Sequence, residues 1–204
     1  PLILPSGLWA ASKNGAGPNA RINIGMIGMG KRMRSLTKSL AAFDDVRLTA
    51  VSDVVEERSD AGAADIEKAY TEQNTGTSLS EYPDFRDLLA DDSIDAVVIS
   101  TPDHWHAIQS VLAARAGKHI YCEKPLTRTI AEGRAVVQAA RDNDITFQTG
   151  SQQRTEYGGK FRTAVEYVRN GRIGDLKEIY IGVHGPAVPC DLPEEPLPPG
   201  IDWD

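Results

Sequence analysis

Short apolar runs and longer helical segments alternate along the chain between Arg21 and Gly150. The runs that predict strands are 22–27, 47–51, 95–100, 119–122 and 146–149, and any strand within 72–80 is weak. The segments that predict helices are 31–43, 55–70, 104–116 and 129–143, with one or two helical turns at 85–89. This alternation predicts an α/β fold in which a doubly wound parallel sheet carries helices on both faces. Ligands of such sheets bind at the carboxyl ends of the strands.

The size and composition of the chain exclude several classes of protein. Its 204 residues suffice for one full domain and about a third of another. Hydrophobic residues make up 41% and charged residues 25%, which excludes a wholly disordered chain. The net charge of −7, without a basic or amphipathic stripe, argues against nucleic acid or a membrane surface as a partner. Two cysteines are too few for a disulfide framework or a four-thiolate zinc site.

The pattern divides the chain into three parts. Residues 1–20 form an N-terminal extension and linker, 21–150 the sheet domain, and 151–204 the beginning of a second α/β domain with an open sheet. The third part contains a predicted helix at 159–170 and a predicted strand at 177–183, which has no partner strand in this chain. Its last twenty residues hold six of the twelve prolines, which is unusual at the end of a compact domain. We therefore expect the remainder of the second domain to lie beyond this sequence.

The first eleven residues carry an apolar patch that permits two interpretations. The patch includes Leu2, Leu4 and Trp9, but it is shorter than the ~20 apolar residues that span a bilayer. Residues 14–20 are rich in Gly, Asn and Ala and predict a linker. The patch is either the tail of a cleaved export signal or a flexible extension that packs on its own domain, and the residues alone leave both open.

Two glycines lie between the first predicted strand and the first predicted helix. Gly28 permits a tight turn, and Gly30 lets the backbone approach a pyrophosphate closely. The amides that begin the helix, at Lys31 and Arg32, then supply hydrogen-bond donors and partial positive charge. The third position of this dinucleotide-binding pattern holds Met33 instead of Gly or Ala, so a larger side chain must fit between the strand and the helix.

Asp53 ends the second predicted strand, twenty-five residues after Gly28. A carboxylate near this spacing accepts hydrogen bonds from both ribose hydroxyls of a dinucleotide and repels a 2′-phosphate, which favours NAD over NADP. The alternative is that Asp53 caps the following helix, which is a common use of aspartate. The glycine loop, the spacing and the strand pattern together favour dinucleotide binding.

The segment Ser-Thr-Pro-Asp-His-Trp-His at 100–106 follows the strand predicted at 95–100. Its histidines suggest a metal site, but residues two apart on a helix point about 200° apart, so His104 and His106 cannot chelate one ion together. No cysteine pair or H-E-x-x-H pattern is present to complete a zinc site. We expect instead that this segment walls a nicotinamide pocket and that one histidine faces it.

Glu123 and Lys124 follow the strand predicted at 119–122. A lysine at a strand end beside a glutamate can donate or accept a proton in a pocket. The alternative is an ordinary surface ion pair. Because neighbouring parallel strands end at one edge, a shared site is the favoured hypothesis. Cys122 and Cys190 are predicted to be unpaired, and nothing near Cys122 is typical of a nucleophilic thiol site.

Taken as a set, these residues resemble the glucose–fructose oxidoreductase/inositol dehydrogenase (Gfo/Idh/MocA) family. The resemblance rests on the order and spacing of 28–30, Asp53, 101–106, 123–125 and 150–154. It implies an NAD-binding Rossmann domain, followed by a domain that forms the substrate site and the contact between subunits of a homo-oligomer. It also implies Lys124 as the catalytic or proton-relay lysine, His106 as a catalytic group near the nicotinamide, and Gln152 as a polar residue on the nicotinamide side. The cofactor contacts expected are Gly28, Gly30, Lys31, Arg32, Asp53, Ser100, Thr101, Pro102, His104, Glu123, Lys124 and Gln152.

The function implied by the resemblance is hydride transfer between a nicotinamide cofactor, NAD rather than NADP, and a secondary alcohol of a sugar or cyclitol. Two alternatives stay open: an NAD-dependent glycoside-cleaving enzyme that works by transient oxidation and elimination, and a non-catalytic NAD-binding module. No metal is expected. Residues 1–11 also resemble the segment after a twin-arginine leader, which implies a periplasmic or exported protein, with a cytoplasmic one as the alternative. We expect this chain alone to bind the cofactor without catalysis.

Overall fold

The computed structural model describes residues 21–72, 78–152 and 157–182, together with the single residues 185, 196 and 199. The chain forms two compact units, of which the first reaches Gly150 and the second comprises Ser151–Pro199. Segment 1–20, on which the prediction of export rests, lies outside the described residues. In the part that the structure describes, no helix is both long and apolar enough to cross a bilayer.

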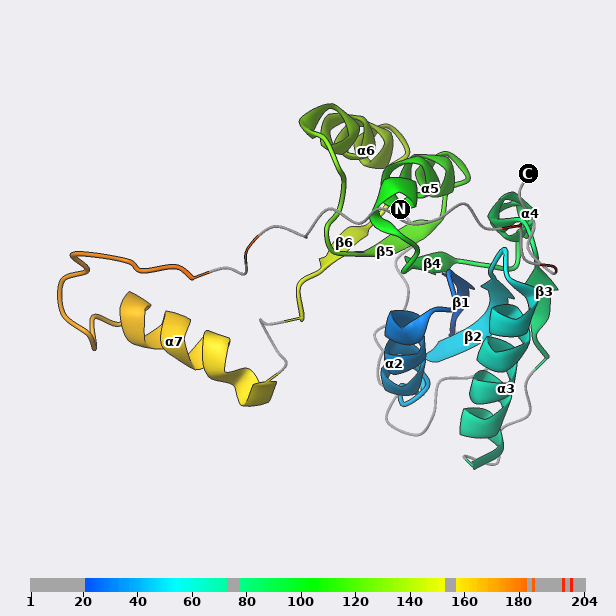
Figure 1. The fold of residues 1–204 in the computed structure, drawn as a ribbon, viewed down its shortest axis with the longest axis horizontal. Coiled ribbons are helices and arrows are strands. Elements are labelled where there is room, and N and C mark those ends of the chain that lie inside the picture. Colours follow the sequence, from blue (N-terminus) through cyan, green and yellow to red (C-terminus); the bar gives the residue numbers. More distant parts are fainter. Residues whose placement is uncertain are drawn as a thin grey trace, which may run out of the picture. The chain divides into compact units, whose positions relative to one another are not determined.

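The first unit is built on a six-stranded, fully parallel sheet. The strands are β1 (Ile22–Ile27), β2 (Val46–Ser52), β3 (Ser80–Tyr82), β4 (Ala96–Ile99), β5 (His119–Glu123) and β6 (Phe147–Gly150). Their spatial order is β3-β2-β1-β4-β5-β6, so the winding direction reverses between β1 and β4 (Figure 1). This is the strand order of the dinucleotide-binding Rossmann fold, and it confirms the predicted doubly wound sheet.

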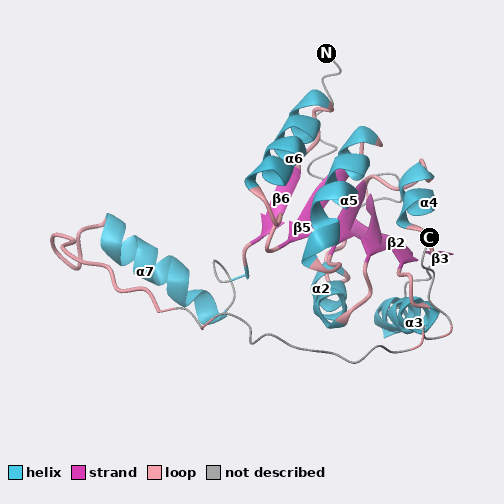
Figure 2. Cartoon of the chain, turned by 45° about the horizontal axis from the view of Figure 1, so that its top comes forward, coloured by secondary structure: helices cyan, strands magenta, loops and turns pink. Residues whose placement is uncertain are grey.

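Helices cover both faces of this sheet (Figures 1 and 2). They are α2 (Lys31–Leu40), α3 (Glu56–Glu72), α4 (Phe85–Ala90), α5 (Asp103–Arg115) and α6 (Ile130–Asp142). One buried cluster contains Met33 of α2 and Ile66 of α3, and the other contains Ala113 of α5. Val97 and Val98 are neighbours in β4 but join different clusters, because successive residues of a strand point to opposite faces.

Local signals in the sequence explain how two of the helices begin. The Thr129 side chain accepts a hydrogen bond from the Glu132 amide at 3.2 Å, and the Glu132 side chain accepts one from the Thr129 amide at 3.1 Å. This reciprocal capping box opens α6, as the T-x-x-E pattern predicts. Asp84 caps α4 by accepting a hydrogen bond from the Arg86 amide at 2.8 Å.

Two segments differ from the sequence prediction. Segment 72–80 gives only a weak strand signal, yet the short strand β3 pairs with the end of β2. The strand predicted at 177–183 does not form over its described residues 177–182, where Tyr180 is 90% exposed. The described residues of the second unit hold no other strand with which it could pair, and an isolated strand is not stable in water.

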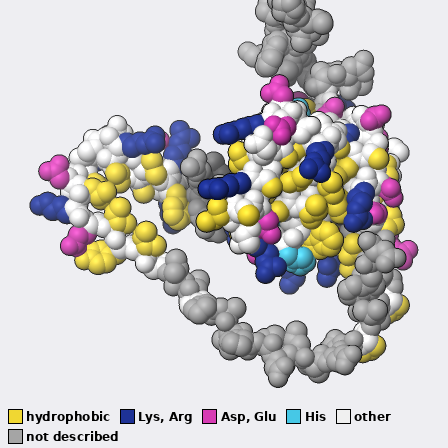
Figure 3. Space-filling model, turned by 90° about the horizontal axis from the view of Figure 1, so that it is seen from above, with side chains coloured by type: hydrophobic (Ala, Val, Ile, Leu, Met, Phe, Trp, Pro, Cys, Tyr) yellow, Lys and Arg dark blue, Asp and Glu magenta, His cyan; other side chains and the backbone are white. Residues whose placement is uncertain are grey.

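The second unit contains the short 3₁₀ turn η4 (Tyr157–Gly159) and the helix α7 (Lys160–Arg169). The helix was expected from the sequence, but none of its side chains is buried. Phe161, Val165 and Val168 follow the spacing of one helix face and remain exposed, with hydrophobic side chains visible at the surface of this unit in Figure 3. This is the pattern of a helix that packs against another element.

Candidate functional site

The loop between β1 and α2 requires glycine at Gly28 for its own packing. Gly28 has a φ angle of +87°, in a region that other residues rarely adopt. A Cβ atom at this position would lie 2.9 Å from the backbone nitrogen of Thr101 and 3.0 Å from the carbonyl carbon of Ser100. Glycine therefore allows the end of β1 to lie directly against the turn that follows β4.

Gly30 has a different role in the same loop. Its φ and ψ angles of −71° and −177° are ordinary extended values, and a Cβ atom there would have no neighbour within 4 Å. Helix α2 begins at the next residue without a side-chain cap, so its first amides keep hydrogen-bonding capacity and partial positive charge. Open space beside uncapped helix amides suits an anionic group such as a pyrophosphate.

Met33, at the third position of the glycine pattern, is fully buried. It belongs to the same buried cluster as Met26 and Leu48 of the sheet. The departure from the usual Gly or Ala is thus accommodated in the core beneath α2, away from the loop that would receive a ligand.

Asp53 connects the glycine loop to the start of α3. Its Oδ2 accepts a hydrogen bond from the Met29 amide at 2.7 Å, and its Oδ1 accepts one from the Val55 amide at 3.0 Å. Asp53 thus holds the chain just before α3 and also lines the cavity, and its contact with the ribose stays a prediction. A carboxylate has about four acceptor positions, so two backbone donors leave capacity for ribose hydroxyls.

The turn after β4 is fixed by two neighbouring elements. The Ser100 amide donates to the Ile27 carbonyl at 2.9 Å, which fastens the turn to β1. The Thr101 hydroxyl donates to Oε1 of Gln109 at 2.7 Å, and Gln109 is a buried residue of α5. These bonds give the turn one defined position at the point where the strand order reverses.

A cavity of about 380 Å³ lies at this edge of the sheet. Eight residues predicted as cofactor contacts line it: Gly28, Gly30, Lys31, Arg32, Asp53, Ser100, Thr101 and Pro102. Its volume lies within the range of small-molecule sites. The cavity combines the uncapped start of a helix, a carboxylate at the end of β2 and two basic side chains in the first turn of α2.

Sequence reasoning missed several other lining residues, among them Val54, Arg58, Pro83, Phe85 and Arg86, whereas Trp105 lies in segment 100–106, which was expected to wall a pocket. Phe85 and Trp105 meet edge to face with ring centroids 6.2 Å apart, and the Arg86 guanidinium lies 5.2 Å from the Phe85 ring centroid. The weak signal of β3 concealed the residues that follow it. Had β3 been recognised, its carboxyl end would have directed attention to this wall.

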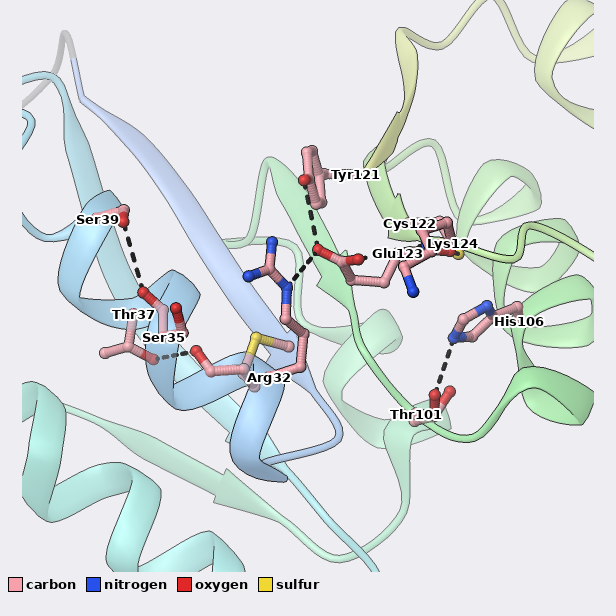
Figure 4. Close-up of polar contacts among 11 residues, drawn as sticks. Arg32, Ser35, Thr37, Ser39, Thr101, His106, Tyr121, Cys122, Glu123 and Lys124 are labelled. Carbon is pink, nitrogen blue, oxygen red and sulfur yellow. Dashed lines mark hydrogen bonds and ion pairs between the residues drawn. The ribbon is translucent and has the colours of Figure 1, made fainter. Parts of the chain in front are cut away.

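Glu123 and Arg32 join the end of β5 to the start of α2. Arg32 Nε donates to Glu123 Oε1 at 2.9 Å, and the Glu123 side chain is only 5% exposed (Figure 4). The Tyr121 hydroxyl approaches the same oxygen at 3.5 Å, and burial, followed by the Glu123 charge, raises the pKa of Tyr121. Lys124 is exposed. Glu123 and Lys124 do not line the cavity, but they stand at the end of the strand beside β4.

The two histidines of segment 100–106 differ in exposure. His104 is exposed, with its ring centroid 6.1 Å from that of Trp105. His106 is 1% exposed, and its ring nitrogens lie 2.7 Å from the Pro125 carbonyl oxygen and 2.9 Å from the Thr101 carbonyl oxygen. Neither histidine lines this cavity. Both ring nitrogens of His106 have backbone partners, and the placement of one histidine at the nicotinamide, with His106 as a catalytic group, stays a prediction.

The remaining predictions concern Gln152, a metal site and the two cysteines. Gln152 is half-buried and belongs to the second unit. Among the described residues, no group of three His, Cys, Asp or Glu side chains is placed to hold a metal ion. Cys122 is fully buried, and burial raises the pKa of its thiol to about 11. Cys190 lies outside the described residues.

Comparison with known proteins agrees with this geometry. The Gfo/Idh/MocA family model, described as an oxidoreductase family with an NAD-binding Rossmann fold, matches residues 22–151. The chain belongs to this family. Its relatives include a myo-inositol 2-dehydrogenase of Thermotoga maritima, 29% identical over 168 residues, which are 82% of this chain and 47% of the relative. A glycosyl hydrolase family 109 protein of a Shewanella species is 32% identical over 169 residues, 81% of this chain and 34% of that protein.

Solved structures of the family share the fold. The crystal structure of scyllo-inositol dehydrogenase from Lactobacillus casei, with bound cofactor NAD(H) and scyllo-inositol, is 29% identical and has a TM-score of 0.61. The match covers 76% of this chain and 43% of that one. The chain thus spans less than half the length of these relatives.

NAD is the cofactor of this Rossmann domain, and the residues present fit it. The decisive observation is the space at Gly30, which a Cβ atom would occupy without touching the protein itself. The loop and the first amides of α2 would hold the pyrophosphate, and the remaining acceptor positions of Asp53 would receive ribose hydroxyls.

Proposed function

We propose that the protein containing this chain transfers a hydride between NAD and a secondary alcohol of a sugar or cyclitol. The proposal is supported by membership of the oxidoreductase family and by the likeness to inositol dehydrogenases. The observation that carries it is the placement of Lys124 at the end of β5, beside the β4 turn that walls the cavity. NAD supplies the hydride acceptor when bound, and the protein supplies position and proton transfer.

Each part of the edge has its own task in this proposal. The glycine loop and α2 bind the pyrophosphate, and Asp53 accepts hydrogen bonds from the ribose hydroxyls. The side-chain amine of Lys124, in its neutral form, takes the proton from the reacting hydroxyl and becomes an ammonium group. Arg32 joins α2 to Glu123, so that the loop that carries the cofactor and the strand that carries Lys124 keep one spacing.

The test is alcohol-dependent formation of NADH by the complete protein. Cyclitols and sugars are supplied one at a time with NAD, and NADH and the ketone product are quantified together. The proposal expects one NADH per molecule of alcohol consumed. It is overturned if the protein binds NAD but no polyol of either class gives NADH, a result expected both of a non-catalytic binding module and of a glycoside-cleaving enzyme.

A second candidate function follows from the likeness to the glycosyl hydrolase family 109 protein. In an NAD-dependent cleavage of a glycoside, a sugar hydroxyl is first oxidised, and the adjacent C–H becomes acidic. The glycosidic group is then eliminated, water adds, and the hydride returns to the sugar. This reaction releases the leaving group without net NADH and exchanges one ring hydrogen with solvent. Glycoside hydrolysis in deuterium oxide, followed by mass spectrometry of the sugar, separates the two functions.

Export and assembly into a homo-oligomer stay predictions.

A further inference from the structure

His106 occupies an unusual position for a polar side chain. It lies in the first turns of α5 and is 1% exposed. Its Nδ1 is 2.7 Å from the carbonyl oxygen of Pro125, and its Nε2 is 2.9 Å from the carbonyl oxygen of Thr101. One imidazole ring therefore contacts the turn after β4 and the turn after β5; Figure 4 shows the contact with Thr101.

The two partners of the ring are acceptors only. A neutral imidazole donates one hydrogen bond and can satisfy one of the carbonyls, whereas a doubly protonated ring donates to both. An apolar side chain of similar size would donate to neither and would leave both carbonyl groups without this partner. Filling space in the core thus does not explain a histidine at this position, whereas donation to the carbonyls does.

Gln109 strengthens the hold of α5 on the first of these turns. It is 4% exposed and accepts the Thr101 hydroxyl at 2.7 Å, one turn of α5 after His106. Thr101 is thus held by its carbonyl group and by its hydroxyl group from the same helix. Because Thr101 also lines the cavity, α5 determines the position of a wall that the cofactor meets.

The second carbonyl partner belongs to the residue directly after Lys124. Pro125 has no amide of its own, so its carbonyl is its only backbone hydrogen-bonding group. Fixing this carbonyl limits how far the backbone of Lys124 can move relative to Thr101. The Lys124 side chain is exposed, and among the described residues no hydrogen bond or ion pair limits its motion in the same way.

We propose that His106 is a positioning residue that joins Thr101 to Pro125 and thereby holds Lys124 at a fixed distance from the cofactor. The inference rests on the proposed function of Lys124. His106 itself touches neither substrate nor cofactor in this assignment. Its loss should therefore disturb turnover more than binding of NAD or of the alcohol.

The test compares His106→Leu and His106→Gln with wild type in the complete protein. Leucine removes both ring nitrogens at similar size, and glutamine retains an amide donor for one carbonyl. His119→Leu is the matched control, because His119 also bonds to the backbone, accepting the Thr146 amide at its Nδ1 at 2.9 Å, but lies at the opposite end of β5. The measurements are kcat, KM for the alcohol, the Kd for NAD, and amide hydrogen exchange in 121–127 and in β4.

For His106→Leu, the expected result is a fall in kcat of at least tenfold, with KM and the NAD Kd within about threefold of wild type. His106→Gln should lose less kcat than His106→Leu. Amide exchange in 124–127 should accelerate at least tenfold while β4 stays protected. His119→Leu should leave all four measurements near wild type.

Three outcomes overturn the inference. Unchanged kcat and unchanged exchange in His106→Leu would show that the ring does not position Lys124 for turnover. A parallel loss of kcat, NAD binding and β4 protection would show a general structural role. The exchange measurement needs no substrate, so it stands even if no polyol is oxidised. Faster exchange in 124–127 with unchanged kcat would reject the positioning role while leaving the proposed function intact.

Discussion

The carboxyl edge of the sheet has two halves that are held together in different ways. The first, the cofactor half, consists of Gly28, Gly30 and Asp53 at the ends of β1 and β2. Its contacts are mainly with the backbone: a glycine lies against a neighbouring turn, and a carboxylate accepts two amides. Changing a residue here changes the space or the donors that the backbone itself requires.

The second, the reaction half, consists of Thr101, Glu123 and Lys124 at the ends of β4 and β5. Its residues are held by side chains from other elements: Arg32 from α2 bonds to Glu123, and His106 from α5 contacts the Thr101 carbonyl. From this difference we expect NAD binding and turnover to depend on separate sets of contacts. Substitutions in one half should therefore affect one property and spare the other.

The largest expected effect is on stability, from Gly28→Ala in the cofactor half. The new methyl group requires an unfavourable backbone angle and meets the backbone of Ser100 and Thr101. We expect a loss of about 3 kcal/mol in the free energy of unfolding, measured by urea denaturation. Gly117→Ala, also at positive φ but with open space around its Cβ, is the control and should lose clearly less. Equal losses in the two variants would refute the contact with the β4 turn.

Gly30→Ala should separate binding from folding within the same loop. The methyl group enters space that is open in the protein and that the pyrophosphate needs, so NAD binding should weaken about 100-fold. The free energy of unfolding without NAD should stay near that of wild type. Isothermal titration calorimetry with NAD, beside urea denaturation, checks both. Normal NAD affinity in this variant would contradict the placement of the pyrophosphate.

Glu123→Gln tests the ion pair between the two halves. It leaves the Arg32 guanidinium without its charged partner in a partly buried position, and we expect a loss of about 1.5 kcal/mol in unfolding free energy. Asp65→Asn removes the carboxylate of the exposed Arg34–Asp65 pair and should change stability little. Equal losses of unfolding free energy in Glu123→Gln and Asp65→Asn would contradict a larger contribution of the Arg32–Glu123 pair.

The smallest expected effect concerns Cys122, directly before Glu123. Its folded pKa of about 11 exceeds the ordinary value of 9.0, so the folded state keeps its proton longer than the unfolded state. Stability from this group is complete below pH 9 and is lost as the pH rises toward 11, by about 1 kcal/mol at pH 10. Urea denaturation at pH 8 and pH 10 should show this extra loss in wild type but not in Cys122→Ala. An equal loss in both proteins would refute it.

The cofactor half could be predicted from the sequence because short-range constraints determine it. Gly28 and Gly30 follow a strand at the expected point, and Asp53 follows the next strand at the expected distance. Backbone geometry limits the residue types at such positions, so the pattern carries the information. The alternation of strands and helices predicted the parallel sheet for the same reason.

The rest of the edge depends on contacts between distant segments. Nothing in segment 100–106 reveals that His106 contacts Pro125, nineteen residues later. Pro83 and Phe85 were missed because β3, which directly precedes them, has three residues and a weak pattern. The strand predicted at 177–183 has the composition of a strand, but pairing with neighbours, not composition, forms a sheet.

The most direct test of the account is the effect of Lys124→Ala on turnover and on NAD binding in the complete protein. Because Lys124 belongs to the reaction half and not to the cofactor half, kcat for alcohol oxidation should fall at least 100-fold. The Kd for NAD should stay within about threefold of wild type. Lys68→Ala, which removes an exposed lysine of α3, is the matched control and should change neither. Turnover by Lys124→Ala within threefold of wild type would contradict the central role given to Lys124.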